Sequence, residues 1–178
     1  MGYWIIKIIL IFLSINLSAQ QYIGKAGKIS FFSETPLENI SAVNNKVSAV
    51  YDSNTKQLVF QLAIEDFNFP IKLMQEHFNE NYLESDIYPS STFDGQIISE
   101  ESNNKLNKTK VAGDLTIHGI TNFVTVEGDL IKKNNEIFIS ADFTVKLKDY
   151  DIDVPKIVFY KIAQIIDVSV EIKLEQIK

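Results

Sequence analysis

Hydrophobic and polar residues alternate along most of this chain, so that apolar side chains recur at every second position. In the clearest run, every odd-numbered position is apolar: Ile137, Ile139, Ala141, Phe143, Val145 and Leu147. A period of two places such side chains on one face of a β-strand. Seven further segments are typical of strands, at residues 28–33, 46–51, 57–65, 92–98, 110–118, 123–131 and 164–175. The pattern therefore predicts an all-β protein with eight strands.

One stretch, residues 70–83, breaks the period of two. Its apolar residues recur at spacings of three and four: Ile71, Met74, Phe78 and Tyr82. This spacing places them on one side of a helix, with polar residues mostly on the other side. Pro70 fits a first helical turn, where a missing N–H costs little. We therefore expect one amphipathic helix between the third and fourth strands, lying against the body that the strands form.

The connections and the lengths of the strands indicate how the strands are arranged. Short turns are expected at residues 52–56, 119–122 and 132–135, and loops at residues 37–42, 100–108 and 149–162. The last strands run to roughly ten residues or more, against an average of about five or six. Long antiparallel strands fit a barrel better than a sandwich. A barrel of about eight strands is either filled by its own side chains or holds one small ligand.

Two of the glycines inside predicted strands are at positions 113 and 128. A glycine within a strand often marks a bend or a close approach of backbone or ligand. We therefore expect a bend, or a close approach of backbone or ligand, at both positions.

The first twenty residues differ from the rest of the chain. Residues 5–13 are apolar except for Lys7, and the small pair Ser18-Ala19 precedes a polar sequence. This is the pattern of a signal peptide over residues 1–20, with cleavage near Ala19 or Gln20. A membrane anchor is the alternative, but the apolar run is shorter than the ~20 residues of a spanning helix. We expect export, followed by one domain over residues 21–178.

Composition narrows the classes of function. The chain has 178 residues, of which 46% are hydrophobic and 22% charged, as in a single globular domain. The net charge of −6 argues against nucleic acid and anionic membrane surfaces as partners. The absence of cysteine excludes disulfides, zinc–thiolate sites and thiol catalysis. A homodimer is compatible with the sequence.

Three blocks of sequence resemble the YceI-like family. They are residues 73–83 with Tyr88-Pro89 and Phe93-Asp94-Gly95, residues 111–121, which include Gly-Asp-Leu-Thr-Ile-His-Gly-Ile-Thr, and residues 149–152 with Pro155. The resemblance covers residues 28–175. It implies an antiparallel, lipocalin-like barrel in the periplasm that binds polyisoprenoid or a similar long apolar lipid along its axis. It implies no catalysis and no cofactor.

The inward face of such a barrel is the candidate binding surface. Burial of an alkyl or isoprenyl chain gains roughly 0.8 kcal/mol per CH₂, so continuous apolar faces are sufficient for binding. From face and position, rather than from the family motifs, we expect the ligand to contact Phe60, Leu62, Met74, Phe78, Leu115, Val126, Phe143 and Val170. The alternative is that the same residues fill a dry barrel that has no ligand and serves as a stress or interaction module.

An enzyme acting on a small apolar substrate is a further alternative, with His118 as acid or base, since histidine titrates near neutral pH. No nucleophile motif accompanies His118 in the sequence, and it lies next to the predicted turn at Gly119. A structural role, with the ring bonded to turn backbone, is the favoured interpretation. His77 lies between the two faces of the helix and is expected at the rim of the barrel. We predict no catalytic residue.

The alternating acids Asp149, Asp151 and Asp153 suggest a calcium loop. An EF-hand pattern requires glycine at the sixth position and glutamate at the twelfth, where this chain has Val154 and Tyr160. A solvated acidic loop is therefore expected, and no metal site.

A membrane-spanning barrel would also show alternating strands, with its apolar face outward. The amphipathic helix and the lack of evenly spaced aromatic girdles argue against it. We expect no stable membrane insertion once the signal peptide is removed.

Overall fold

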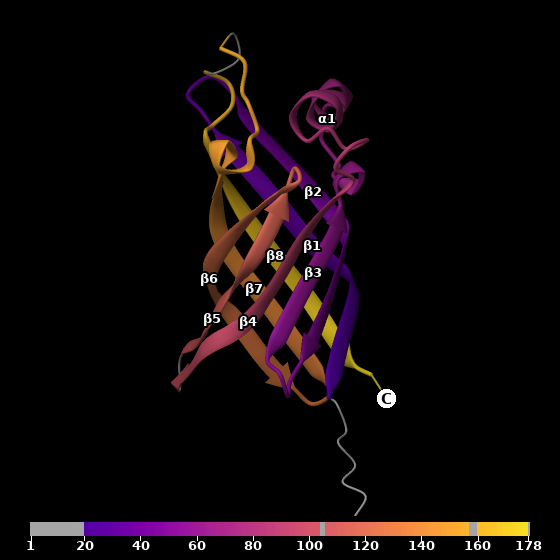
Figure 1. Cartoon of the computed structure of the whole chain (residues 1–178), viewed down its shortest axis with the longest axis vertical. Helices are drawn as coiled ribbons and strands as arrows, with labels where there is room; N and C mark the ends of the chain where they lie inside the picture. Colours follow the sequence, from indigo (N-terminus) through magenta and orange to yellow (C-terminus); the bar gives the residue numbers. More distant parts are fainter. Residues whose placement is uncertain (1–19, 104–105, 157–159, 178) are drawn as a thin grey trace, which may run out of the picture.

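The chain forms one closed barrel of eight antiparallel strands that pair in chain order, with β1 closing against β8 (Figure 1). The structure is a computed structural model and describes residues 20–103, 106–156 and 160–177. The strands are β1 Gln21–Glu34, β2 Asn39–Asp52, β3 Gln57–Ala63, β4 Ser90–Asn103, β5 Leu106–Ile117, β6 Ile120–Lys133, β7 Glu136–Lys146 and β8 Ile165–Gln176. The predicted fold, an eight-stranded antiparallel barrel with one helix between β3 and β4, is confirmed.

The short helical elements lie together at one end of the barrel (Figure 1). Between β3 and β4 the chain forms the 3₁₀ turn η1 (Ile64–Asp66), the helix α1 (Lys72–His77) and the π-helical turn η2 (Phe78–Tyr82). A second 3₁₀ turn, η3 (Leu147–Tyr150), follows β7. We call this end the mouth. The opposite end, which holds the β2–β3 and β6–β7 turns and the C-terminus, is the closed end.

Several strands are longer than the alternation predicts. Residues 37–42 and 100–108 were expected as loops, but β2 begins at Asn39, β4 continues to Asn103 and β5 resumes at Leu106. The loop prediction was wrong because the hydrogen bonds of a ladder come from the backbone. In β1, which begins well before residue 28, Gly27 packs against Ile172, where a Cβ would lie 2.7 Å from its side chain.

The boundaries around the helix also differ from the prediction. The α-helix begins at Lys72, with extended backbone at Ile71, so Pro70 precedes the first turn rather than occupying it. β3 ends at Ala63, two residues early, because Ile64 turns into η1. β6 begins at Ile120, since the β5–β6 turn needs only two residues.

That turn consists of His118 and Gly119, with φ of 51° and 72°. Positive φ at both central residues is the geometry of a type I′ hairpin. Gly119 meets this requirement at no steric cost.

Two clusters of buried side chains fill the barrel at different heights. The cluster at the closed end contains Tyr22, Ala49, Tyr51, Leu58, Ile137, Ile139, Ile172 and Leu174. The cluster at the mouth is smaller and contains Ile64, Leu83, Val145, Tyr150 and Ile152.

The predicted signal peptide lies outside the described residues except for Gln20, so it stays a prediction together with the domain boundary at residue 21. In the part of the chain that the structure describes, no helix is long and apolar enough to cross a membrane.

Candidate functional site: an apolar cavity along the barrel axis

Two adjoining cavities occupy the barrel interior. The upper cavity, at the mouth, has a volume of about 460 Å³, and the lower cavity, nearer the middle of the barrel, about 110 Å³. Five residues line both: Ile29, Leu62, Ser91, Leu115 and Phe143. The cavities therefore adjoin, one above the other along the barrel axis, with these residues between them. The upper cavity alone falls within the roughly 300–1,000 Å³ of small-molecule sites.

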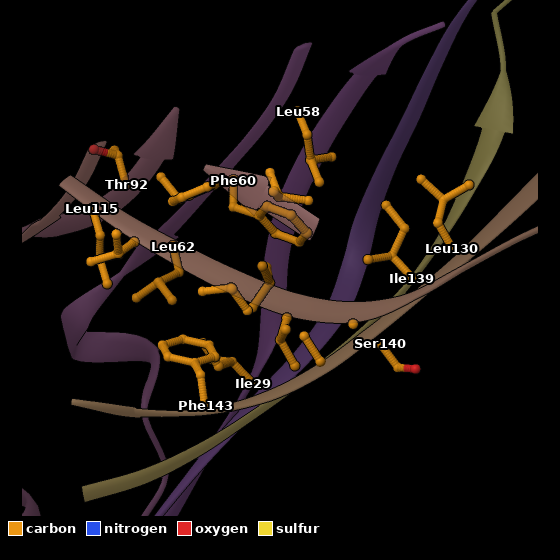
Figure 2. A pocket seen from close by; sticks show the side chains of 18 of the residues that line it. Ile29, Leu58, Phe60, Leu62, Thr92, Leu115, Leu130, Ile139, Ser140 and Phe143 are labelled. Atoms are coloured by element: carbon orange, nitrogen blue, oxygen red, sulfur yellow. The ribbon is translucent and has the colours of Figure 1, made fainter. Parts of the chain in front are cut away.

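The lower cavity is surrounded by inward-facing side chains from every part of the barrel wall (Figure 2). Its apolar lining includes Phe60, Leu62, Phe93, Val111, Leu115, Val124, Val126, Phe143 and Val170. Thr92 and Ser140 also belong to the lining, but their hydroxyl groups point away from the cavity (Figure 2). The surface offered to a ligand is accordingly almost entirely hydrocarbon, which suits an alkyl or isoprenyl chain.

Glycines shape this wall. Gly95 and Gly113 are opposite each other in the β4–β5 ladder, and a Cβ on Gly113 would lie 2.2 Å from the Gly95 Cα. The Phe93 ring covers Gly95, where a Cβ would lie 2.4 Å from the ring. Gly128 is equally close to its neighbour strand, with a built Cβ 2.4 Å from the Ser140 carbonyl oxygen. Of the expected alternatives, a close approach of backbone is present at positions 113 and 128.

Four phenylalanine rings form one side of the upper cavity. Phe31 comes from β1, Phe67 and Phe69 follow η1, and Phe78 begins η2. Phe31 stacks on Phe78 with ring centroids 5.5 Å apart, and Phe69 lies 5.0 Å from Phe78. We call these four residues the phenylalanine cluster. It narrows the mouth and presents aromatic faces and edges to whatever occupies the cavity.

The upper cavity is lined by an ion pair and a buried hydroxyl group as well as by apolar side chains. Lys161 and Glu38 form an ion pair, with Nζ 3.5 Å from Oε2, and the buried Ser33 hydroxyl accepts a hydrogen bond from the Ala163 N–H at 2.9 Å. Burial raises the pKa of the Tyr82 hydroxyl, so this phenol stays neutral near pH 7. A ligand with one polar end would thus find its polar partners at the mouth.

Comparison with known proteins identifies the family. The family model for the YceI-like domain matches residues 22–175, which is most of the chain. The chain belongs to the YceI-like family. No curated protein matches it.

Solved structures share the fold of this YceI-like chain. BcnA of Burkholderia cenocepacia is 17% identical with a TM-score of 0.70, over 83% of this chain and 95% of BcnA. A polyisoprenoid binding domain from Saccharophagus degradans, implicated in plant cell wall breakdown, is 12% identical with a TM-score of 0.74, over 89% and 99%. The Campylobacter jejuni YCEI protein is 20% identical with a TM-score of 0.59, over 76% and 83%. At these identities the likeness concerns the fold alone.

All eight residues predicted to contact a ligand lie in the lining of this YceI-like barrel. Phe60, Val126 and Val170 line the lower cavity, Met74 and Phe78 line the upper cavity, and Leu62, Leu115 and Phe143 line both. The barrel strands position six of these residues, η2 positions Phe78 and α1 positions Met74. Their contact with a ligand remains a prediction.

Sequence reasoning missed other lining residues, chiefly Phe31, Phe67 and Phe69 of the phenylalanine cluster, Ile29, and Phe93. Phe93 and Ile29 lie in segments that were predicted as strands, so the alternation could have found them. Phe67 and Phe69 follow β3, where the chain has left the barrel wall and the period no longer shows which way a side chain points.

His118 joins three segments at the mouth without lining either cavity. Its Nδ1 lies 3.1 Å from the Tyr150 carbonyl oxygen, which can only accept, so Nδ1 donates. Its Nε2 lies 2.9 Å from Glu84 Oε2, and the Tyr88 ring packs edge-on at 4.7 Å between centroids. The ring therefore bonds the backbone of η3 rather than that of its own turn.

The acidic residues after β7 are arranged by the fold of the loop. Asp149, Asp151 and Asp153 are all exposed, and Asp151 ends η3 in the left-handed region with φ of 54°. Across the described ranges, no three His, Asp or Glu side chains come together in a way that could hold a metal ion.

Proposed function

We propose that this chain is an exported binding protein that holds a long-chain apolar lipid, such as an isoprenoid, a quinone or a fatty lipid, for transport or storage. The observation that carries the proposal is the continuous hydrocarbon lining of two cavities that share a wall within a barrel that is filled at one end. The solved domain from Saccharophagus degradans, which is described as polyisoprenoid binding, supports the same class of ligand.

The energetics favour a chain-like ligand. A dozen buried carbons gain roughly 10 kcal/mol before the costs of association, at about 0.8 kcal/mol for each CH₂. Those costs include lost translation, rotation and chain freedom, and they consume a large part of this gain. A net gain of about 8 kcal/mol corresponds to micromolar affinity, so the apolar lining suffices without a strong charged contact.

The distribution of polar groups supports one orientation. Ser33, Glu38 and Lys161 all line the upper cavity, while the lining of the lower cavity is mostly apolar. The polar end of the ligand then lies at the mouth, and its tail extends past Leu115 and Phe143 towards Val126 and Val170. The ligand is held and released unchanged, and the protein resides in the periplasm or is secreted.

Native mass spectrometry of the mature protein, purified from its own periplasm, tests the proposal directly. We expect a retained mass that solvent extraction identifies as a polyprenyl, quinone or acyl chain. The same spectrum reports whether the protein is a homodimer. An empty protein that also takes up no isoprenoid on titration would contradict the proposal and favour a filled barrel without ligand.

Two filling variants locate the ligand. Leu115→Trp and Val170→Trp each place a large ring in the lining, so we expect them to lower lipid retention at least tenfold while the fold survives. Ile98→Trp is the matched control, because Ile98 is 60% exposed and lines neither cavity. Unchanged retention in both lining variants would exclude the interior as the binding site.

A further inference from the structure

The wall of the barrel has an incomplete boundary between β6 and β7. The ladder joining these strands runs from Lys133↔Glu136 at the closed end to Gly128↔Ala141 and ends there. Residues 120–127 of β6 and 142–146 of β7 have no partner in this ladder, among the residues that the structure describes. The neighbouring β5–β6 ladder, in contrast, continues towards the mouth as far as the pair Ile117↔Ile120. We call the gap between residues 120–127 and 142–146 the β6–β7 slot.

Two carboxylates flank the point where the ladder stops. If the register continued by one pair, Glu127 would be opposite Asp142. Like charges directly opposite destabilise a strand pair. Each carboxylate instead turns to its other neighbour: Glu127 lies 3.8 Å from the Lys110 ammonium group, and Asp142 accepts a hydrogen bond from the Ser169 hydroxyl.

The slot borders the lower cavity on both sides. Val124 and Val126 of β6 and Phe143 of β7, which flank it, all belong to the cavity lining. The lining also includes Asp129 and Ser140, the pair adjacent to the end of the ladder, and the Ser140 hydroxyl points away from the cavity (Figure 2). The cavity thus extends to the backbone at the point where the strands separate.

A second short ladder, β2–β3, is closed by other means. It contains the pairs from Tyr51↔Leu58 to Ser48↔Gln61, but Val43 and Asn68 exchange two backbone hydrogen bonds of 3.1 and 2.8 Å above it. The Asn44 amide adds a bond of 2.9 Å to the Ala63 carbonyl. In the described ranges, the hydrogen bonds that join β6 and its turn to the segment after β7 lie only at the mouth. There the Asn122 amide donates to the Asp149 carbonyl oxygen at 2.6 Å, and the His118 ring bonds the Tyr150 carbonyl oxygen.

We propose that the β6–β7 slot is a lateral portal through which an apolar chain enters and leaves the lower cavity. The inference rests on the proposed function and adds the route of the ligand. End-on insertion through the mouth would draw every carbon past the phenylalanine cluster, whose rings are in mutual contact. Sideways passage between β6 and β7 breaks no backbone ladder, because none joins the strands there.

Cross-linking across the slot tests the portal. Thr125 and Thr144 are exposed and would be opposite each other if the ladder were extended, and the natural chain has no cysteine. We would join Thr125→Cys and Thr144→Cys with a short bismaleimide and follow uptake and release of dansyl-labelled geranylgeraniol by stopped-flow fluorescence. We expect both rates to fall at least tenfold after cross-linking, with little change in the equilibrium dissociation constant.

The matched control is a cross-link across a complete ladder. Thr144→Cys with Asp167→Cys joins β7 to β8, where Thr144 and Asp167 are a register pair, and it should leave both rates unchanged. Unchanged rates in the slot variant, or an equal decrease in the control, would overturn the portal while leaving the proposed function intact. A parent protein that binds no probe would overturn the proposed function and the portal with it.

A charge variant provides an independent measurement. Asp142→Lys would place opposite charges across the slot, facing Glu127, and should draw the strands together and slow exchange about threefold or more. Asp142→Asn removes the same carboxylate without adding a cation and serves as its control. Exchange as fast in Asp142→Lys as in Asp142→Asn would contradict the portal.

Discussion

The two ends of this barrel are made from the same eight strands, yet one end is filled and the other is hollow. At the closed end, Tyr51, Ile137 and Leu174 are each 0% exposed and pack in a single cluster. At the mouth, Phe31, Phe69 and Phe78 are only half-buried and surround a cavity of about 460 Å³. Alternation along a strand determines which side chains face inward, but it does not determine whether they meet.

The ladders explain the difference between the ends. Both short ladders, β2–β3 and β6–β7, lie at the closed end, where they hold opposite sides of the barrel together. Towards the mouth neither ladder continues: the β6–β7 strands separate, whereas β2 is joined to the segment after η1 through Val43 and Asn68. We infer that the closed end supplies most of the stability, while the mouth retains the space and mobility that binding needs.

The largest expected effect is a core truncation at the closed end. Leu174→Ala removes a fully buried side chain and should lower the free energy of unfolding by about 2–5 kcal/mol. Val126→Ala, in the cavity lining, should cost about 1 kcal/mol or less, because its side chain already borders empty space. Urea unfolding of the ligand-free protein measures both, and equal losses would remove the distinction between the two ends.

A smaller effect is expected from the histidine at the mouth. His118→Asn keeps a residue that tolerates positive φ but cannot reach both Tyr150 and Glu84. We expect a loss of about 1–2 kcal/mol in unfolding free energy and unchanged lipid retention at equilibrium. Lys148→Asn, at an exposed position of η3 that lines neither cavity, is the control and should change neither quantity. A loss of substrate turnover in His118→Asn would instead favour the enzyme alternative.

Tyr51 should make the stability of the closed end depend on pH in the alkaline range. Burial raises the pKa of its hydroxyl, so the folded state favours the neutral phenol. The contribution of the neutral phenol to the free energy of unfolding is fully present below the ordinary tyrosine pKa of about 10. It is lost as the pH rises through the raised pKa of the folded state. Tyr51→Phe should therefore be more stable than the parent above about pH 10.

At neutral pH, Tyr51→Phe should lie within about 1 kcal/mol of the parent, since the hydroxyl is buried without a hydrogen bond of acceptable geometry. Unfolding curves at both pH values make the comparison. A large loss at neutral pH would show that the hydroxyl has a stabilising partner.

The smallest expected effect is at the β2–β3 turn of the closed end. The backbone N–H groups of Thr55 and Asn54 lower the pKa of the Asp52 carboxyl. The stability that the ionised carboxylate gives to this turn is present above the ordinary aspartate pKa of about 3.9. It is lost as the pH falls through the lowered pKa of the folded state. Asp52→Asn should flatten the acid limb of the unfolding curve slightly, as measured by thermal melts. An unchanged acid limb would contradict this role of the turn.

Much of the architecture was predictable from the sequence, because it depends on local spacing. The period of two located eight strands and the spacing of three and four located the helix, although the helix proved to be a short α segment followed by a π turn. The inward faces followed from the same spacing, which is why all eight predicted ligand contacts lie in the cavity lining.

The errors of prediction fall where local spacing carries no information. Residues 37–42 are mixed in character and residues 100–108 are almost all polar, yet parts of both pair as strands, because pairing depends on a partner elsewhere in the chain. The phenylalanine cluster brings β1 together with the segment after η1 and with η2, which no short window of sequence could indicate.

The sequence by itself determined the number of strands, their faces and the apolar character of the interior. Only the tertiary structure decided that the interior is hollow at the mouth and filled at the closed end. Whether facing side chains meet depends on where each ladder ends, and that depends on the register between strands that are distant in the sequence, as at Gly128↔Ala141.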